Sequence, residues 1–309
     1  MELYQIILIV IGSLLLIATI FAFFIGRTFY VVSFSRRKDD AHFAEHENPE
    51  DKKRPDRIWY FSNELEELEI TSFDKLKLKG YFINNNSDKL AVLVHGYRGR
   101  HYSLTSQARI FFENGYDVLS INNRAHDSSE GKYFSMGPRE RKDLLKWIDF
   151  MIKRNPNYQI ALLGTSMGAH IVMMTGADET IPSNVKCIIE DCGYASLKEM
   201  LFQGVKTTKV KFPKLALNLG EIYARIFHHV SFKDSTEDAF EHLKLPILLI
   251  HGGLDKYVPY ENLARNASYV PSEIYKEVVT FENADHNRSV FEYDRYKNLV
   301  INFTSKFIK

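Results

Sequence analysis

Cysteine is scarce in this sequence: Cys187 and Cys192 are the only two among 309 residues. Two cysteines five positions apart match neither a zinc-binding pattern nor the disulfide framework of a small secreted domain. We therefore expect two free thiols. The histidines are scattered along the chain as well, so we predict no metal site.

An excess of charge of one sign is also missing. The 40 Lys and Arg residues nearly balance the 39 Asp and Glu residues, and the net charge is +1. Because the basic residues are spread along the chain, nothing marks a binding surface for nucleic acid. A hydrophobic fraction of 45% is enough for a large core, and we expect one catalytic-size domain without internal repeats.

One long hydrophobic run is present, at the N-terminus. Residues 6–25 form an uncharged stretch of twenty residues, which is long enough to cross a hydrocarbon core of about 30 Å as a helix. A cleaved signal peptide is the alternative. It is disfavoured because only Glu2 carries a charge before the run and no small-x-small cleavage site follows it. We predict a retained transmembrane anchor over residues 1–35.

Flanking charges predict the orientation of this anchor. Glu2 precedes the span, whereas Arg27, Arg36, Arg37 and Lys38 follow it. The positive-inside rule then places the body of this single-pass membrane protein in the cytoplasm. Residues 36–64 begin with a charged, polar stretch and are predicted to form a juxtamembrane linker.

Strand and helix patterns alternate after the linker. Strand patterns cover 68–71, 75–83, 90–94, 116–121, 159–163, 186–190, 246–250 and 277–281, and helix patterns cover 103–114, 138–154, 167–175 and 293–307. This order predicts an α/β fold over residues 65–309, with an opening antiparallel pair and a mostly parallel sheet covered by helices on both faces. An insert at about 193–244 is predicted to form a small helical cap.

The segment GTSMG at residues 164–168 contains a candidate nucleophile, Ser166. A G-x-S-x-G match would occur by chance roughly one time in ten in a chain of this length. Its position is more informative, because it joins the end of a buried strand to the start of a helix. That is the strand-turn-helix context of a nucleophile elbow, in which Gly164 and Gly168 allow the two elements to approach.

A serine nucleophile needs a base and a group that orients the base. Asp255 and His286 follow the last two predicted strands, which gives the order Ser, acid, His. Asp191, at the end of another strand, is a competing candidate for the acid. Asp285 is next to the base in sequence and would usually point away from it.

Four motifs in order resemble the serine-type α/β-hydrolases: HGY at 95–97, GTSMG at 164–168, HGGLDKYVP at 251–259 and ADH at 284–286. With the anchor, the chain is similar to uncharacterised membrane-anchored α/β-hydrolases of bacteria. The resemblance implies Ser166 as nucleophile, Asp255 as acid and His286 as base. It implies an oxyanion hole formed by the backbone N–H groups of Tyr97 and Met167, and neither metal nor organic cofactor.

One further residue of these motifs and one further segment are expected to have structural roles. His95 is expected to form structural hydrogen bonds rather than to catalyse. The segment NNRAHDSSEG at 122–131 resembles a loop that braces the site in this family, with Asn122 in place of Asp, Ala125 in place of Gly and Asp127 in place of Gly. These changes weaken any analogy of substrate but leave the triad intact.

The sequence thus predicts a membrane-anchored serine hydrolase that cleaves a carboxylic ester, amide or thioester through an acyl-enzyme. A lipid or other acyl ester is one substrate hypothesis, since the anchor would hold the enzyme near lipids. A serine peptidase of the prolyl-oligopeptidase type and an acyltransferase remain alternatives. The non-enzymatic alternative is an inactive membrane scaffold that retained the fold.

Overall fold

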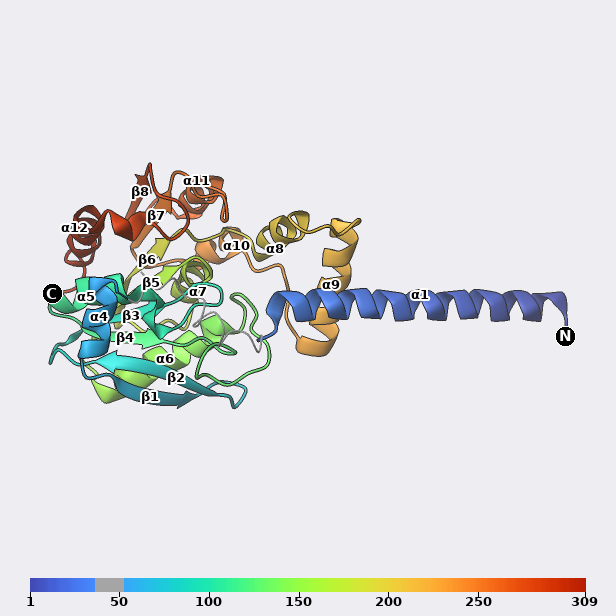
Figure 1. Ribbon diagram of the computed structural model, residues 1–309, viewed down its shortest axis with the longest axis horizontal. Coiled ribbons are helices and arrows are strands. Elements are labelled where there is room, and N and C mark those ends of the chain that lie inside the picture. Colours follow the sequence, from blue (N-terminus) through green and yellow to red (C-terminus); the bar gives the residue numbers. More distant parts are fainter. Residues whose placement is uncertain (37–52) are drawn as a thin grey trace. The chain divides into compact units, whose positions relative to one another are not determined.

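The computed structural model describes residues 1–36 and 53–309 (Figure 1). The described chain divides into two compact units. One contains residues 1–35 and 198–233, and the other contains the described part of 36–197 together with 234–309.

The larger unit is built on an eight-stranded sheet with the order β1-β2-β4-β3-β5-β6-β7-β8. The strands are β1 (Glu66–Thr71), β2 (Lys77–Ile83), β3 (Lys89–Val94), β4 (Asp117–Ile121), β5 (Gln159–Thr165), β6 (Val185–Asp191), β7 (Ile247–Gly252) and β8 (Lys276–Phe281). Strand β2 pairs antiparallel with both of its neighbours, β1 and β4. The remaining neighbours in the sheet order, from β4 through β3 to β8, pair in parallel. The predicted strands and the mostly parallel sheet are confirmed.

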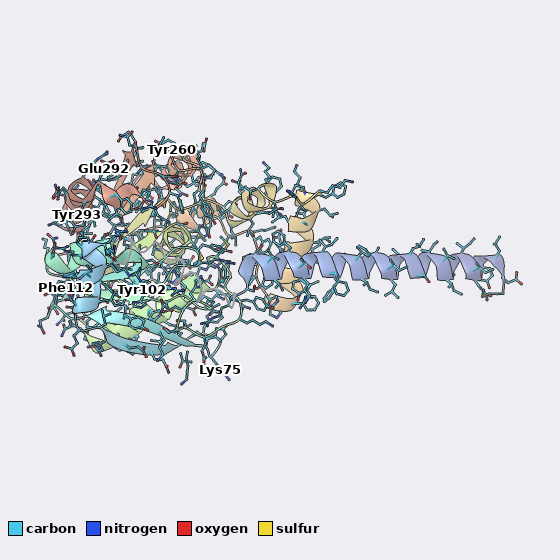
Figure 2. The ribbon with its side chains drawn as sticks, in the orientation of Figure 1. Lys75, Tyr102, Phe112, Tyr260, Glu292 and Tyr293 are labelled. Carbon is cyan, nitrogen blue, oxygen red and sulfur yellow. The ribbon has the colours of Figure 1, made fainter. Side chains whose placement is uncertain are left out.

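One difference concerns the start of β2, which was predicted at residue 75 and begins at Lys77. Lys75, which is labelled in Figure 2, has φ +70° in the turn between β1 and β2. The Ser72 N–H donates to the Leu76 carbonyl across that turn. The alternation of apolar and polar residues continues through the turn, so this alternation does not mark the start of β2.

Helices cover both faces of the sheet. They are α4 (Pro55–Ser62), α5 (Thr105–Glu113), α6 (Glu140–Arg154), α7 (Met167–Gly176), α10 (Thr236–Ala239), α11 (Glu261–Tyr269) and α12 (Tyr293–Thr304). On one face, Leu93, Leu163 and Ile189 share a core with residues of α4, α5 and α12. The alternate residues of these strands point to the opposite face of the sheet, which carries α6 and α7. On that face, a side chain on Gly176 of α7 would contact Ile188 of β6.

Helix α4 was not predicted. Residues 37–52, most of the predicted linker, lie outside the described residues, but Pro55–Ser62 near its end are helical and Tyr60 is completely buried. The Tyr60 hydroxyl is 3.0 Å from His101 Nδ1. The structure therefore differs from a linker at this end of the predicted range 36–64, because Trp59 and Tyr60 pack against the core.

The smaller unit contains α1 (Leu3–Phe34), most of α8 (Leu197–Lys206) and α9 (Pro213–His228). Helix α1 is long and apolar enough to cross a membrane, a property that signal sequences share. Its last turns pack closely against α9: a Cβ on Gly26 would lie 2.5 Å from the Leu219 carbonyl oxygen, and one on Gly220 would lie 2.2 Å from the Phe29 ring. Tyr30 is completely buried and stacks on His228 with 4.0 Å between the ring centroids.

The predicted cap insert at about 193–244 is divided between the two units. Residues 198–233 group with α1, whereas both ends of the insert belong to the larger unit. At these ends, the Thr236 N–H donates to the Ala195 carbonyl, and the Ala195 N–H donates to the Asn262 side chain. These two hydrogen bonds tie the ends of the insert to the sheet unit.

Candidate active site

Ser166 stands between β5 and α7 with a strained backbone. Its φ of +54° and ψ of −118° fall outside the regions that L-residues ordinarily occupy. The flanking glycines make this turn possible: a Cβ on Gly164 would lie 2.1 Å from the Gly168 carbonyl oxygen, and one on Gly168 would lie 2.0 Å from the Val94 carbonyl oxygen. The turn holds Ser166 at the carboxyl end of the sheet, 3% exposed.

A chain of hydrogen bonds links Ser166 to residues far away in sequence. His286 Nε2 lies 3.0 Å from Ser166 Oγ, and His286 Nδ1 lies 2.7 Å from Asp255 Oδ2. Because an ionised carboxylate can only accept, Nδ1 carries the proton and Nε2 is left to accept from the serine. This is the tautomer that a general base requires.

The Asp255 carboxylate is almost fully buried in the loop after β7. Its Oδ1 accepts from the backbone N–H groups of Tyr257 and Val258, each at 2.9 Å. Burial works to raise the pKa of Asp255, but hydrogen bonds from His251 and His286 outweigh it and hold the pKa well below the usual value. Asp255 is therefore an ionised, fixed acceptor for His286.

His251 is a residue whose contribution the sequence analysis did not identify. It is completely buried, and its Nε2 lies 3.0 Å from the Val258 carbonyl oxygen and 3.4 Å from Asp255 Oδ2. The available signal was its spacing, since His251 is the penultimate residue of β7 and stands four positions before Asp255.

The two competing acids lie elsewhere. Asp191 Oδ1 accepts from the Ser289 hydroxyl at 3.2 Å, and burial raises the pKa of Asp191 to about 6. Asp285 Oδ1 accepts from the His286 backbone N–H rather than from its ring. Neither carboxylate occupies the position next to His286 Nδ1.

The candidate oxyanion donors, Tyr97 and Met167, lie close to the serine in the chain or in space. Met167 is the first residue of α7, where an amide has no carbonyl partner within its own helix. Tyr97 follows Gly96, whose Cα approaches Ser166 so closely that a Cβ there would lie 3.2 Å from the Ser166 Cβ. The two amides thus come from the two loops that meet at Ser166.

His95 forms two structural hydrogen bonds. Its Nε2 accepts from the Asn123 N–H at 3.1 Å, so Nδ1 carries the proton and donates to the Gly96 carbonyl at 2.8 Å. Burial lowers the pKa of His95 well below its usual value, which keeps the ring neutral. This geometry agrees with the structural role predicted for it.

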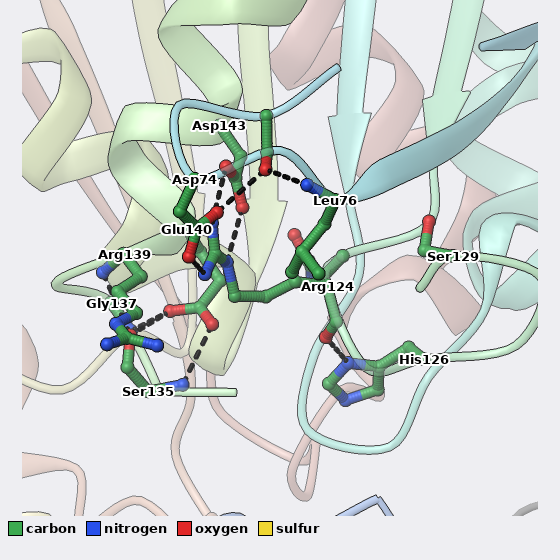
Figure 3. A network of polar contacts seen from close by, with 12 residues as sticks. Asp74, Leu76, Arg124, His126, Ser129, Ser135, Gly137, Arg139, Glu140 and Asp143 are labelled. Atoms are coloured by element: carbon green, nitrogen blue, oxygen red, sulfur yellow. Dashed lines mark hydrogen bonds and ion pairs between the residues drawn. The ribbon is translucent and has the colours of Figure 1, made fainter. Parts of the chain in front are cut away.

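The loop at 122–131 is braced by a buried arginine (Figure 3). Arg124 is completely buried and donates to both carboxylate oxygens of Asp143, at 2.6 and 2.7 Å, and to both oxygens of Asp74, at 2.8 and 2.9 Å. Ala125 and Asp127, which replace glycines of the family pattern, both have positive φ, +59° and +43°. The loop retains the glycine-like conformation although it lacks these glycines.

One group of described residues has the composition of a metal site. Potential ligand atoms of Cys192, Asp255 and His286 lie within 4.8 Å of one another. Burial raises the pKa of the Cys192 thiol well above its usual value, and its Sγ donates to Asn287 Oδ1 at 3.0 Å. A metal ligand would have to be a thiolate, so these side chains fit the hydrogen-bonded arrangement better than a metal centre.

Comparisons of the sequence identify one family model and one related protein. Residues 85–227 match the family model described as serine aminopeptidase, S33. The uncharacterised protein YqkD of Bacillus subtilis is 24% identical over 217 residues, which are 69% of this chain and 70% of YqkD.

Three esterases share the fold. The Pyrococcus furiosus esterase Pf2001 is 26% identical, with a TM-score of 0.65 over 81% of this chain and 95% of its own. The Exiguobacterium antarcticum esterase EaEST is 17% identical, with a TM-score of 0.57 over 77% of this chain and 98% of its own. Est1E of Butyrivibrio proteoclasticus, solved with ferulic acid bound, is 20% identical, with a TM-score of 0.58 over 77% of this chain and 99% of its own. The chain therefore has the α/β-hydrolase fold, and the solved structures that share this fold include esterases.

Proposed function

We propose that this protein is a serine hydrolase that cleaves a carboxylic ester through an acyl-enzyme on Ser166. The observation that carries the proposal is the hydrogen-bond chain from Ser166 through His286 to Asp255, at 3.0 and 2.7 Å. In this mechanism His286 Nε2 accepts the Ser166 proton as Oγ attacks the ester carbonyl. The backbone N–H groups of Met167 and Tyr97 stabilise the oxyanion that forms.

Collapse of the tetrahedral intermediate expels the alcohol, which receives the proton from His286. Water then attacks the acyl-enzyme with His286 again accepting the proton, and the acid product leaves. Asp255 stays ionised throughout, orients His286 and stabilises its protonated form.

The test is hydrolysis of p-nitrophenyl butyrate by the full chain in a mild detergent. We expect kcat/KM to fall by on the order of 10⁴-fold or more in Ser166→Ala. Cys192→Ser is the matched control that leaves the nucleophile in place. Equal activity of Ser166→Ala and the wild type would contradict the proposal, and an inactive wild type would favour the scaffold alternative.

A second candidate is an aminopeptidase, because the matching family model carries that description. The same triad would then attack an amide. Aminoacyl p-nitroanilides separate the two functions: faster turnover of these amides than of the matched esters would favour the peptidase.

We further propose that α1 is a retained membrane anchor rather than a signal peptide. Cleavage after the apolar run would remove Phe23, whose ring centroid lies 5.5 Å from that of Tyr223 and 5.6 Å from that of Phe227 in α9. The flanking charges support a cytoplasmic location for the sheet unit. Protease treatment of intact cells tests this orientation, because digestion of the sheet unit from outside would overturn it.

A further inference from the structure

A cavity of about 390 Å³ lies beside the candidate active site within the sheet unit. His286 and Tyr97 line it, which places it next to the candidate base and an oxyanion donor. Its volume suits a small ligand rather than a macromolecule. The proposed ester therefore has an adjoining pocket for one of its ends.

Four arginines line this cavity: Arg54, Arg57, Arg98 and Arg288. No Asp or Glu is among the described residues that line it. The chain as a whole carries a net charge of only +1, so this concentration of positive charge is local. The arginines come from α4 and its start, the loop after β3 and the loop after β8, which are far apart in sequence.

Two of these arginines are held in place by an aromatic ring rather than by a carboxylate. The guanidinium carbons of Arg54 and Arg288 lie 4.8 and 4.6 Å from the centre of the Phe291 ring. Within the described part of the chain, neither has an Asp or Glu oxygen at ion-pair distance. Arg54 donates one N–H to the Ser106 hydroxyl at 2.9 Å, and Ser106 in turn donates to Asp56 at 2.7 Å. The nearby Asp56 carboxylate is thus engaged by Ser106 and by Arg109.

The other surroundings of the cavity are also favourable for an anion. Arg57 stacks on Tyr102, a residue labelled in Figure 2, and Arg98 stacks on Tyr97. Helix α5 begins at the wall of the cavity, and its first turn contains no acidic residue. The positive end of its dipole therefore adds to the charge of the arginines.

A guanidinium that stacks on a ring keeps its planar set of N–H donors suited to two oxygens of one anion. We propose that Arg54 and Arg288 bind a carboxylate or phosphate group of the substrate in this cavity. The enzyme would then hydrolyse an anionic ester, and the proposal rests on the hydrolase function above. A neutral lipid acyl chain would make no charge-assisted hydrogen bond with these guanidinium groups.

The test compares two esters with the same acyl chain and the same leaving group: 4-nitrophenyl monoglutarate, which has a free carboxylate, and its neutral methyl ester. For the wild-type chain in mild detergent we expect kcat/KM to favour the anionic ester by on the order of tenfold or more. In the double variant Arg54→Gln/Arg288→Gln this preference should disappear while hydrolysis of the methyl ester is retained. Arg295→Gln is the matched control, because Arg295 pairs with Glu282 and Glu292 and does not line the cavity.

Equal kcat/KM for the two esters in the wild type, or an unchanged preference in the double variant, would overturn the inference. Release of 4-nitrophenol from the neutral ester that depends on Ser166 would still support the hydrolase function. Failure of the anion-binding proposal can therefore be distinguished from failure of the proposed function. If neither ester is hydrolysed, calorimetric binding of glutarate and of inorganic phosphate to the same chains tests the cavity by itself.

In the calorimetric arm, binding of either anion that weakens about tenfold in the double variant supports the inference. Selective binding of glutarate assigns a carboxylate, and selective binding of phosphate assigns a phosphate ester. Binding of neither anion at millimolar concentration would overturn it. If phosphate binds selectively, the next experiment measures hydrolysis of phosphatidylglycerol micelles by the wild type and the double variant. Hydrolysis that depends on Arg54 and Arg288 would assign the phosphate to a lipid headgroup.

Discussion

Two buried aspartates at the ends of neighbouring strands behave in opposite ways. Asp191 ends β6 and Asp255 follows β7, and they are 1% and 6% exposed. Burial raises the pKa of Asp191 to about 6, whereas the pKa of Asp255 is held well below its usual value. The difference comes from their partners, because Asp255 has two backbone N–H donors and two histidines around it.

This comparison teaches that burial alone does not define a catalytic acid. A carboxylate that supports His286 must stay ionised, which requires donors that offset its loss of hydration. Glu190, beside Asp191, illustrates the other outcome: one of its oxygens accepts from the Gly193 N–H, the other has no hydrogen-bond partner in the described structure, and burial raises its pKa to about 8.

The largest effect is expected for Asp255→Asn. The amide would donate to His286 Nδ1 and force the proton onto Nε2, so that the base could no longer accept from Ser166. We expect kcat for p-nitrophenyl butyrate to fall by on the order of 10³ to 10⁴-fold. Circular dichroism checks that the variant is folded. Retention of even a tenth of the wild-type kcat would show that another group is the acid.

Next in size is the pH dependence of stability associated with Glu190. Its folded-state pKa is about 8 against an ordinary value of 4.5, so the unfolded state releases its proton at lower pH than the folded state. This contribution to stability is present below pH 4.5 and is lost as the pH rises toward 8, by up to roughly 1.4 kcal/mol per pH unit.

Glu190→Gln should remove this loss of stability between pH 5 and 8. Urea unfolding of the wild type and the variant at one-unit pH steps measures the difference in slope. Parallel stability curves would mean that Glu190 has the same pKa in both states.

A smaller effect is expected for His251→Phe, which removes one of the partners that keep the pKa of Asp255 low. We expect kcat/KM to fall about tenfold, or about 1.4 kcal/mol. At low pH the variant should lose more activity than the wild type, because a higher pKa allows Asp255 to take up a proton there. His251→Gln, which keeps a side-chain donor, should restore most of the activity; a loss that the Gln variant does not reverse, and that is no greater at low pH, would indicate a packing role instead.

The smallest effect is expected for Asp191→Asn. Because Asp191 binds Ser289 rather than His286, kcat/KM should change by less than about threefold, or roughly 0.6 kcal/mol. A loss as large as that of Asp255→Asn would erase the distinction between the two aspartates.

The sheet could be predicted from sequence because each of its buried strands is a short apolar run. The nucleophile elbow could also be located, because Gly164 and Gly168 flank Ser166 in the sequence. Both positions require glycine, since a Cβ there would collide with the backbone of the neighbouring strand or helix. Asp255 and His286 followed from their positions after the last two strands.

Features that depend on tertiary packing could not be predicted in this way. Helix α4 follows a charged stretch, and its apolar residues reveal a core position only once α5 lies beside them. Likewise, Arg54 and Arg288 are more than 200 positions apart and meet at Phe291 only through the fold. No spacing rule in the sequence links them.

The identity of the nucleophile is the central claim, and peptide mapping after fluorophosphonate treatment tests it most directly. We predict a single phosphonyl adduct per chain, located by mass spectrometry on the peptide that contains Ser166, and none in Ser166→Ala. An adduct on a different residue, or equal labelling of Ser166→Ala, would contradict the account.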